Sequence, residues 1–214
     1  VGEVLQDQIP FLRRCVEGNQ VIVVEGDAVR PQIGEPLDAI NHKIAFCPED
    51  RKRDGIIGDL TIRENIALAL QARRGMMKPM SRKEQDELSD KYIKMLSIAT
   101  PDAEKKIKEL SGGNQQKVIL ARWMATEPDV LILDEPTRGI DVGAKAEIQR
   151  LMLEMCNNGM SIIFISSELD EIIRCSNRII VMRDGKKAGE LNGEGCTQAD
   201  IMKVIAGEKV GETA

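Results

Sequence analysis

The sequence predicts an α/β fold with a mainly parallel sheet and one inserted helical subdomain. After residue 110, short apolar runs alternate with amphipathic helical patterns, as in parallel α/β sheets. Between residues 60 and 110 the apolar spacing is helical throughout. The 214 residues suffice for a single domain with a sizeable core. We divide the chain into a core (20–59 and 110–185), a helical subdomain (60–110), and a C-terminal hairpin and helix (186–214).

The composition is ordinary for a soluble globular protein. Hydrophobic residues make up 42% and charged residues 30% of the chain, so disorder is not expected. The net charge of −5 argues against a nucleic-acid-binding protein, which usually carries a basic field. The five cysteines are scattered without Cys-x-x-Cys spacing, which indicates a reduced, cytosolic protein. No apolar run approaches the roughly 20 residues needed to cross a bilayer, and no secretion signal is visible.

Apolar spacing and capping residues predict the elements of the first half. In order, they are a helix over 4–16, strands over 21–24 and 44–47, and helices over 62–73 and 82–96. Thr61 with Glu64 and Ser81 with Glu84 form capping-box pairs, which open the last two helices. Pro101 suits the first turn of another short helix, so we expect one there.

The second half predicts a regular alternation of helices and strands. The elements are helices from 113 to 124, around 148–155, over 168–174 and up to 206, and strands over 130–133, 162–165 and 179–182. Val130–Leu133 is apolar at every position, as in strands buried on both faces of a sheet. Asp184 and Gly185 predict a turn, and Thr197 with Asp200 caps the last helix.

Two carboxylates, Asp134 and Glu135, directly follow the apolar strand. Ligands of open α/β sheets bind at the carboxyl ends of the strands. In phosphoanhydride hydrolysis, the aspartate at this place would hold Mg²⁺, largely through water. The glutamate would orient or deprotonate the attacking water. These two residues alone fit equally well with a strand that simply ends in a polar turn.

Ser111, Gly112 and Gly113 open the helix that precedes this strand. Glycines there leave backbone N–H groups open at the positive end of the helix dipole, where anions bind. The Ser111 hydroxyl adds one more donor. A plain N-cap followed by a flexible turn is the alternative interpretation of these three residues.

Taken together, these motifs resemble the ATP-binding cassette (ABC) family. Residues 110–115 resemble its signature motif, 130–136 its Walker B segment, and 139–141 its D-loop. The resemblance implies a P-loop NTPase-like ABC ATPase core that uses ATP and Mg²⁺. It implies nucleotide binding by Ser111, Gly112, Gly113, Gln115 and Asp141, metal binding by Asp134, and catalysis by Glu135.

Further segments resemble one subfamily, the bacterial monosaccharide importer ATPases, in which two ATPase halves are fused in one chain. Residues 47–55, 110–117, 136–143 and 166–169 carry this resemblance. The chain is similar to the second half, and residues 46–57 and 67–75 look most like the galactofuranose importer. The resemblance implies a head-to-tail partner half, a membrane permease that contacts residues 60–110, and an indirect link to a periplasmic sugar-binding protein. It also implies a cytoplasmic location on the inner face of the membrane.

The chain departs from a complete ABC ATPase at three places. No pair of glycines has the Gly-x-x-x-x-Gly-Lys spacing of the phosphate loop, which the family would place near residues 1–10. We therefore expect an N-terminally incomplete domain that is inactive alone, and marginal in stability or self-associating. Glu49 stands in place of the Q-loop glutamine, and Ser167 in place of the switch histidine. A carboxylate at Glu49 would repel a triphosphate unless a cation intervenes.

The resemblance implies that this half acts in trans. Ser111, Gly112 and Gly113 would contact the γ-phosphate of ATP held by the partner half, and the partner's lysine and glutamate would complete hydrolysis. Two alternatives remain. One is a soluble ABC ATPase of DNA repair or translation, although the long coiled coil or basic linkers usual there are absent. The other is a non-catalytic module that keeps the fold for dimerisation only.

Overall fold

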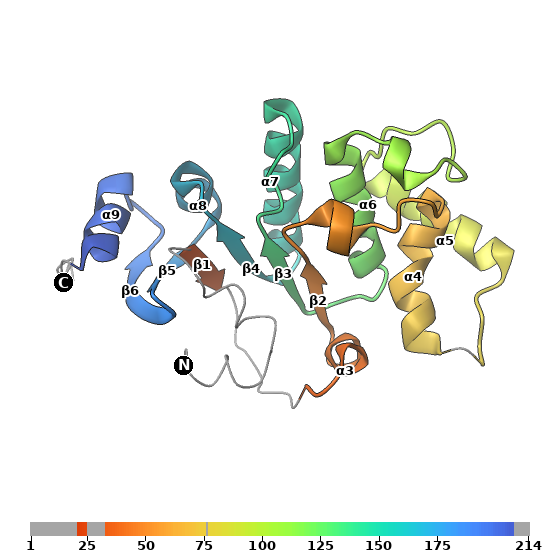
Figure 1. Cartoon of the computed structure of the whole chain (residues 1–214), viewed down its shortest axis with the longest axis horizontal. Coiled ribbons are helices and arrows are strands. Elements are labelled where there is room, and N and C mark those ends of the chain that lie inside the picture. The colour runs from red at the N-terminus through yellow and green to blue at the C-terminus, as the bar shows by residue number, and fades with distance from the viewer. Residues whose placement is uncertain (1–20, 25–32, 76, 208–214) are drawn as a thin grey trace.

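The computed structural model describes residues 21–24, 33–75 and 77–207. A six-stranded sheet forms its centre, with the strand order β2-β3-β4-β1-β5-β6 (Figure 1). The strands are β1 Val21–Val24, β2 Ile44–Cys47, β3 Val130–Asp134, β4 Ser161–Ser166, β5 Arg178–Arg183 and β6 Lys186–Asn192. The first five match the predicted strands to within one residue at each end, and β6 completes the predicted hairpin. The helix predicted over residues 4–16 lies outside the described residues.

The strand directions are more mixed than the predicted parallel sheet. β2, β3 and β4 are parallel to one another, whereas β1 is antiparallel to both β4 and β5. β5 and β6 form an antiparallel hairpin, and Asp184 and Gly185 turn with positive φ as predicted. A four-residue apolar run such as Val21–Val24 carries no information about its direction in a sheet. The α/β class itself is confirmed.

The helices are α3 Pro36–Asn41, α4 Ile62–Arg74, α5 Arg82–Met95, α6 Gly112–Met124, α7 Val142–Asn157, α8 Leu169–Cys175 and α9 Gln198–Ala206. A π-helical turn, η1, covers Arg51–Gly55, and a 3-10 turn, η2, covers Ile107–Glu109. The capping boxes at Thr61, Ser81 and Thr197 all form as predicted. Within the described segments, every helix is too short or too polar to span a bilayer.

The helix expected at Pro101 is absent. The Asp102 carboxylate accepts hydrogen bonds from the amides of Glu104 and Lys105, at 2.8 and 3.0 Å, and so holds a turn instead. Lys106 then bridges to Thr61 in extended conformation before the short η2 turn. This prediction was wrong because an aspartate side chain competes successfully for the backbone amides that a helix would use.

The buried core lies mainly between the sheet and helices α6 to α9. Leu131 and Leu133 face this main cluster, whereas Ile132 between them faces a smaller cluster with Ile165 and Met182. This two-sided burial explains why every residue of β3 before Asp134 is apolar. The β3 strand therefore ends deep in the molecule. Asp134, its last residue, and Glu135, the next one, lie at the carboxyl edge of the sheet.

Helices α4, α5 and α6 group at the β2 end of the sheet (Figure 1), and α4 and α5 lie in the segment predicted as a helical subdomain. Buried Asn65 joins α4 to α6 through Arg122. The Arg122 guanidinium donates to the Asn65 carbonyl and side-chain oxygens, at 2.8 and 2.7 Å, and to the Gly55 carbonyl of η1. The subdomain and the loop after β2 are thus fixed to one buried cation.

Candidate functional site

The signature motif opens helix α6, as the sequence predicts. Ser111 is its N-cap, and its hydroxyl oxygen accepts a hydrogen bond from the Asn114 side chain at 2.9 Å. Ser111 is exposed, and the glycine that follows it is only half-buried. The first-turn amides of a helix have no intrahelical acceptor, so this end presents donors at its positive pole. The arrangement can bind an anionic group that approaches from outside the chain.

Both glycines of the motif lie in close contact with neighbouring side chains. A Cβ atom on Gly113 would lie 2.6 Å from the Cβ of Ala144 in α7. A Cβ on Gly112 would lie 2.7 Å from the Nη2 of Arg51. Neither glycine has a positive φ, so conformational freedom is not the reason for them. The glycines bring the N-terminus of α6 against α7 and against the loop after β2.

Gln115 is buried, and its polar atoms form hydrogen bonds with the segment before Ser111 and with Arg51. Its amide nitrogen donates to the carbonyl of Leu110 at 3.1 Å and to that of Ile107 at 3.4 Å. Its side-chain oxygen accepts from Arg51 Nε at 3.4 Å. These bonds hold the segment that precedes Ser111. A direct contact between Gln115 and nucleotide stays a prediction.

Asp134 and Glu135 lie together at the end of β3, only 8% and 7% exposed. Glu135 has φ +44°, a left-handed backbone that is rare for a residue other than glycine. Its amide donates to the Ile165 carbonyl at 2.9 Å, which ties this strained residue to β4. Backbone strain of this kind persists only where the surroundings enforce it, and it clusters at functional sites.

The structure brings Ser167 to Glu135. The Ser167 amide donates to Glu135 Oε1 at 2.7 Å. Burial raises the pKa of the Glu135 carboxyl; the hydrogen bonds from Ser167 oppose this rise, and the nearby charges of Asp134 and Glu171 add to it. A carboxylate with a raised pKa beside a strand end is suited to accept a proton from water. The predicted catalytic residue and the residue at the switch position therefore form one unit.

Sequence reasoning missed a buried network beside this unit. Glu171 of α8 accepts a hydrogen bond from the Thr137 hydroxyl at 2.6 Å, and Lys145 of α7 lies 3.6 Å from its other oxygen. Lys145 also pairs with Glu168. The network links the loop after β3 to the segment after β4. No sequence signal marks Glu171, because its partners are distant along the chain.

The D-loop lies next to the signature helix of the same chain. Asp141 is exposed and caps α7, with its carboxylate accepting from the Ala144 amide at 2.9 Å. Ala144 is the residue against which Gly113 packs. Capping accounts for Asp141 locally, and its predicted nucleotide contact stays a prediction.

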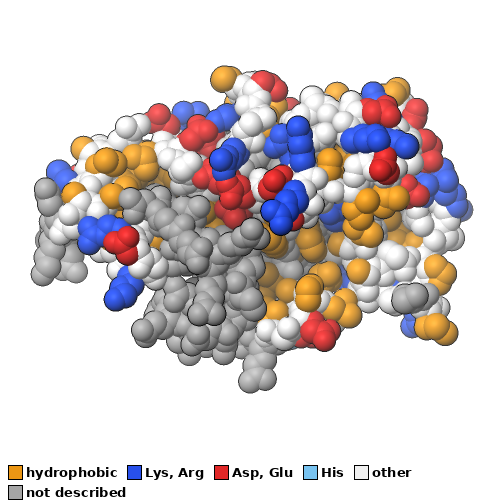
Figure 2. Space-filling view, in the orientation of Figure 1, with side chains coloured by type: hydrophobic (Ala, Val, Ile, Leu, Met, Phe, Trp, Pro, Cys, Tyr) orange, Lys and Arg blue, Asp and Glu red, His pale blue; other side chains and the backbone are white. Residues whose placement is uncertain are grey.

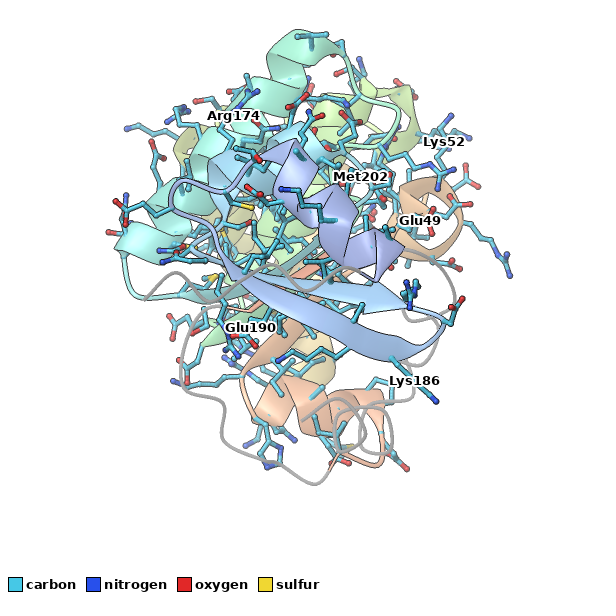
Figure 3. The ribbon with its side chains drawn as sticks, turned by 90° about the vertical axis from the view of Figure 1, so that its left-hand side faces the viewer. Glu49, Lys52, Arg174, Lys186, Glu190 and Met202 are labelled. Atoms are coloured by element: carbon cyan, nitrogen blue, oxygen red, sulfur yellow. The ribbon has the colours of Figure 1, made fainter. Side chains whose placement is uncertain are left out.

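The carboxylate of Glu49 is paired with a neighbouring cation. It forms an ion pair with Arg138, in the loop after β3. Glu49 and Lys52 lie at the segment around η1, well separated from Arg174 of α8 (Figure 3). Arg51, from the same segment, donates to the carbonyls of Arg138 and Gly139, at 2.9 and 3.4 Å. Neither arginine was singled out from the sequence.

The site residues fit Mg²⁺ better than they fit a complete ATP site. Asp134 offers an oxygen ligand of the kind Mg²⁺ prefers, with water completing its shell. Among the described residues, no group of three or more His, Cys, Asp and Glu side chains gathers in a metal-binding arrangement. The 214 residues contain no phosphate loop, so these residues alone do not wrap a triphosphate. On the face in view, acidic and basic side chains are interspersed (Figure 2).

Known proteins with similar sequences are sugar importer components. The chain is 55% identical over 178 residues to the galactofuranose transporter ATP-binding protein of Escherichia coli K12, covering 83% of this chain and 36% of that protein. It is 52% identical over 179 residues to the fructose import ATP-binding protein of Bifidobacterium longum, covering 83% of this chain and 35% of that protein. The chain thus spans about a third of the length of these relatives.

Solved structures and a family match identify the domain type. The ATP-binding cassette MJ0796, in a dimeric post-hydrolysis state bound to ADP and Pi, has a TM-score of 0.64 and 26% identity, covering 77% of this chain and 69% of that one. The cassette MJ1267, at 23% identity and a TM-score of 0.65, shares the fold, covering 81% of this chain and 68% of that one. The family described as "ABC transporter" matches residues 13–138, more than half of the chain. The chain therefore belongs to the ABC transporter family of ATP-binding domains.

Proposed function

We propose that the chain is the second nucleotide-binding half of a monosaccharide importer and donates its signature motif to ATP held by a partner half. Its 55% identity to a galactofuranose transporter ATP-binding protein supports the sugar-import role. The observation that carries the proposal is the N-terminus of α6, where Ser111 is an exposed N-cap and Gly112 is half-buried, so that donors at the positive pole of the helix can be reached from outside the chain.

In this role the chain acts mainly by positioning charge. The Ser111 hydroxyl and the amides of Gly112 and Gly113 bind the γ-phosphate of the partner's ATP as negative charge develops there. Bound Mg²⁺ supplies charge neutralisation to the phosphates. In the chain's own, degenerate site, Asp134 is the ligand available to the ion, and Glu135 is held by Ser167 where it can accept a proton.

The remaining partners follow from the same proposal. The helical subdomain meets the membrane permease on the cytoplasmic face, and a periplasmic sugar-binding protein delivers the sugar. Three exposed apolar side chains on and next to this subdomain suit such a contact: Ile57, Met77 and Met95, which are 44%, 94% and 49% exposed. The acidic balance of the chain gives no support to a nucleic-acid partner.

A titration with a partner cassette tests the trans role. The partner is the part of the E. coli galactofuranose protein that lies outside the matched segment, with its own catalytic glutamate replaced by glutamine so that ATP is retained. Its affinity for a fluorescent ATP analogue with Mg²⁺ is measured as the full 214-residue chain is added. We expect the wild-type chain to tighten ATP binding, and Ser111→Ala to abolish most of this effect.

Ser81→Ala is the matched control, because Ser81 is also an exposed helix N-cap but opens α5, away from the site. Both changes remove a cap that contributes about 1 kcal/mol to stability. An equal loss of ATP retention in both variants would attribute the effect to folding and contradict the proposal. Association with the partner at the same strength with and without ATP would instead indicate a module that keeps the fold for dimerisation only.

A further inference from the structure

The guanidinium of Arg51 lies where three separate segments of the chain meet. It donates to the carbonyls of Arg138 and Gly139 in the loop after β3 and to the side-chain oxygen of Gln115 in α6. Arg51 is half-buried in the π-helical turn η1. Burial lowers the pKa of Arg51, and the charge of Asp50 opposes this decrease.

We propose that Arg51 is a positioning residue that fixes the signature motif relative to the D-loop, so that both face a partner's nucleotide together. This inference rests on the proposed trans function and adds a residue to it. Arg51 does not touch the nucleotide; it acts through the backbone of the two loops that would do so.

The first step of the argument concerns the signature motif itself. Arg51 Nη2 lies so close to Gly112 that a Cβ there would be 2.7 Å away. The guanidinium therefore packs directly on the backbone that presents the donors. Arg51 also bonds Gln115, whose amide holds the Leu110 carbonyl at 3.1 Å. Both sides of Ser111 are in this way connected to one side chain.

The second step concerns the D-loop. The two carbonyls that Arg51 holds precede Asp141, the N-cap of α7. The side chain of Arg138 turns the other way and pairs with Glu49, two residues before Arg51. A closed ring results, in which the segment after β2 grips the loop after β3 through one ion pair and two backbone contacts.

The third step concerns the chemistry of the side chain. Each of the three acceptors is bonded to a different nitrogen of Arg51, namely Nε, Nη1 and Nη2. A guanidinium offers five donors in a fixed planar fork. A lysine carries a single point charge on a flexible stem and cannot reach all three acceptors at once. Lysine at position 51 would preserve the charge and lose the geometry, which makes it an informative substitution.

The test uses Arg51→Lys and Arg51→Gln in the full chain, in the partner-cassette titration described above. Arg53→Gln is the matched control, since Arg53 belongs to the same turn, is exposed, and has a 3.6 Å contact with Asp54 in place of these bonds. We expect both Arg51 variants to weaken the chain-dependent ATP affinity about tenfold, equivalent to about 1.4 kcal/mol. Arg53→Gln should stay within about twofold of wild type, as a surface change does.

A double-mutant cycle with Ser111→Ala separates positioning from general destabilisation. If Arg51 acts through the signature motif, Arg51→Gln should change ATP affinity little once Ser111 is removed, because interacting sites are not additive. Full additivity, or wild-type affinity in Arg51→Lys, would overturn the proposal. If the wild-type chain leaves the partner's ATP affinity unchanged, the trans function fails. In that case, amide hydrogen exchange of the free chain still tests the positioning role of Arg51. The proposal requires faster exchange at residues 110–116 and 138–141 in Arg51→Gln than in Arg53→Gln.

Discussion

Removing the Asn65 side chain is expected to destabilise the junction between the helical subdomain and the core. Asn65 of α4 is fully buried. Its side-chain oxygen accepts from the Ile57 amide at 3.0 Å and from Arg122 Nη2 at 2.7 Å. Its amide nitrogen donates to the carbonyls of Ile57, Leu60 and Thr61. One short side chain thereby satisfies groups from α6 and from the segment between η1 and α4.

The expected magnitude follows from which groups lose their partners in Asn65→Ala. The three carbonyls each keep another donor, the amides of Leu60, Ile107 and Asn65 itself. The Ile57 amide and Arg122 Nη2 both lose their acceptor, the side-chain oxygen of Asn65. Each buried donor left without a partner costs about 1–3 kcal/mol, so we expect a loss of about 3 kcal/mol or more. For a domain of this size, 3 kcal/mol corresponds to a decrease in Tm of about 6–12 °C.

Urea unfolding followed by Trp123 fluorescence measures this effect directly. Trp123 is the single tryptophan of the chain and follows Arg122 in α6, so its emission reports on this junction. Asn41→Ala, at an exposed position at the end of α3, is the control and should stay within about 0.5 kcal/mol of wild type. A loss below about 1 kcal/mol in Asn65→Ala would refute the reasoning, because it would mean that the two donors find other partners without cost.

Three further predictions concern charge, reactivity and packing. Because burial raises the pKa of Glu135, the contribution of this carboxyl to stability falls as the pH rises through its folded-state pKa. Glu135→Gln should therefore have a higher Tm than wild type near pH 7, and this difference should disappear below about pH 4. Burial raises the pKa of the Cys47 thiol to about 12, so mass spectrometry after alkylation at pH 8 should find Cys47 unmodified until the chain is unfolded. Gly189→Ala would place a Cβ 2.6 Å from Val204 Cγ1 and should cost about 1–3 kcal/mol in urea unfolding, with part of the loss recovered by Val204→Ala.

Much of the fold could be predicted because its signals are local. Thr61 with Glu64 and Ser81 with Glu84 form their capping boxes within a single turn, and the structure shows both. Local signals did not predict the antiparallel direction of Val21–Val24, nor that the Asp102 side chain would bind the amides that a helix would use. The direction of a strand depends on neighbouring strands that are far away along the chain. The turn at Asp102 depends on the hydrogen bonds of a single side chain, which a periodic apolar pattern does not reveal.

The candidate site was predictable where a motif carries its own chemistry. Glu135 follows an apolar strand, and Ser111 precedes two glycines at a helix start, so sequence reasoning found both. Arg51 and Glu171 were missed for a common physical reason. The side-chain hydrogen-bond partners of Arg51 shown here, and Thr137, which donates to Glu171, lie more than 30 residues away along the chain. Residues that position a site are recognisable only once the chain is folded.

The two positions that depart from the ABC pattern converge on the same loop. Ser167, in place of the switch histidine, donates its amide to Glu135 at the start of the loop after β3. Glu49, in place of the Q-loop glutamine, pairs with Arg138 further along that loop. A backbone amide and an ion pair thus hold the loop from both sides, and neither contact requires the residue usual in the family. Since Asp141 follows directly and caps α7, the D-loop keeps a defined position in this chain. Under the proposed function, the departures remove groups that would sense a nucleotide bound to this chain and retain the surface that a partner half would meet.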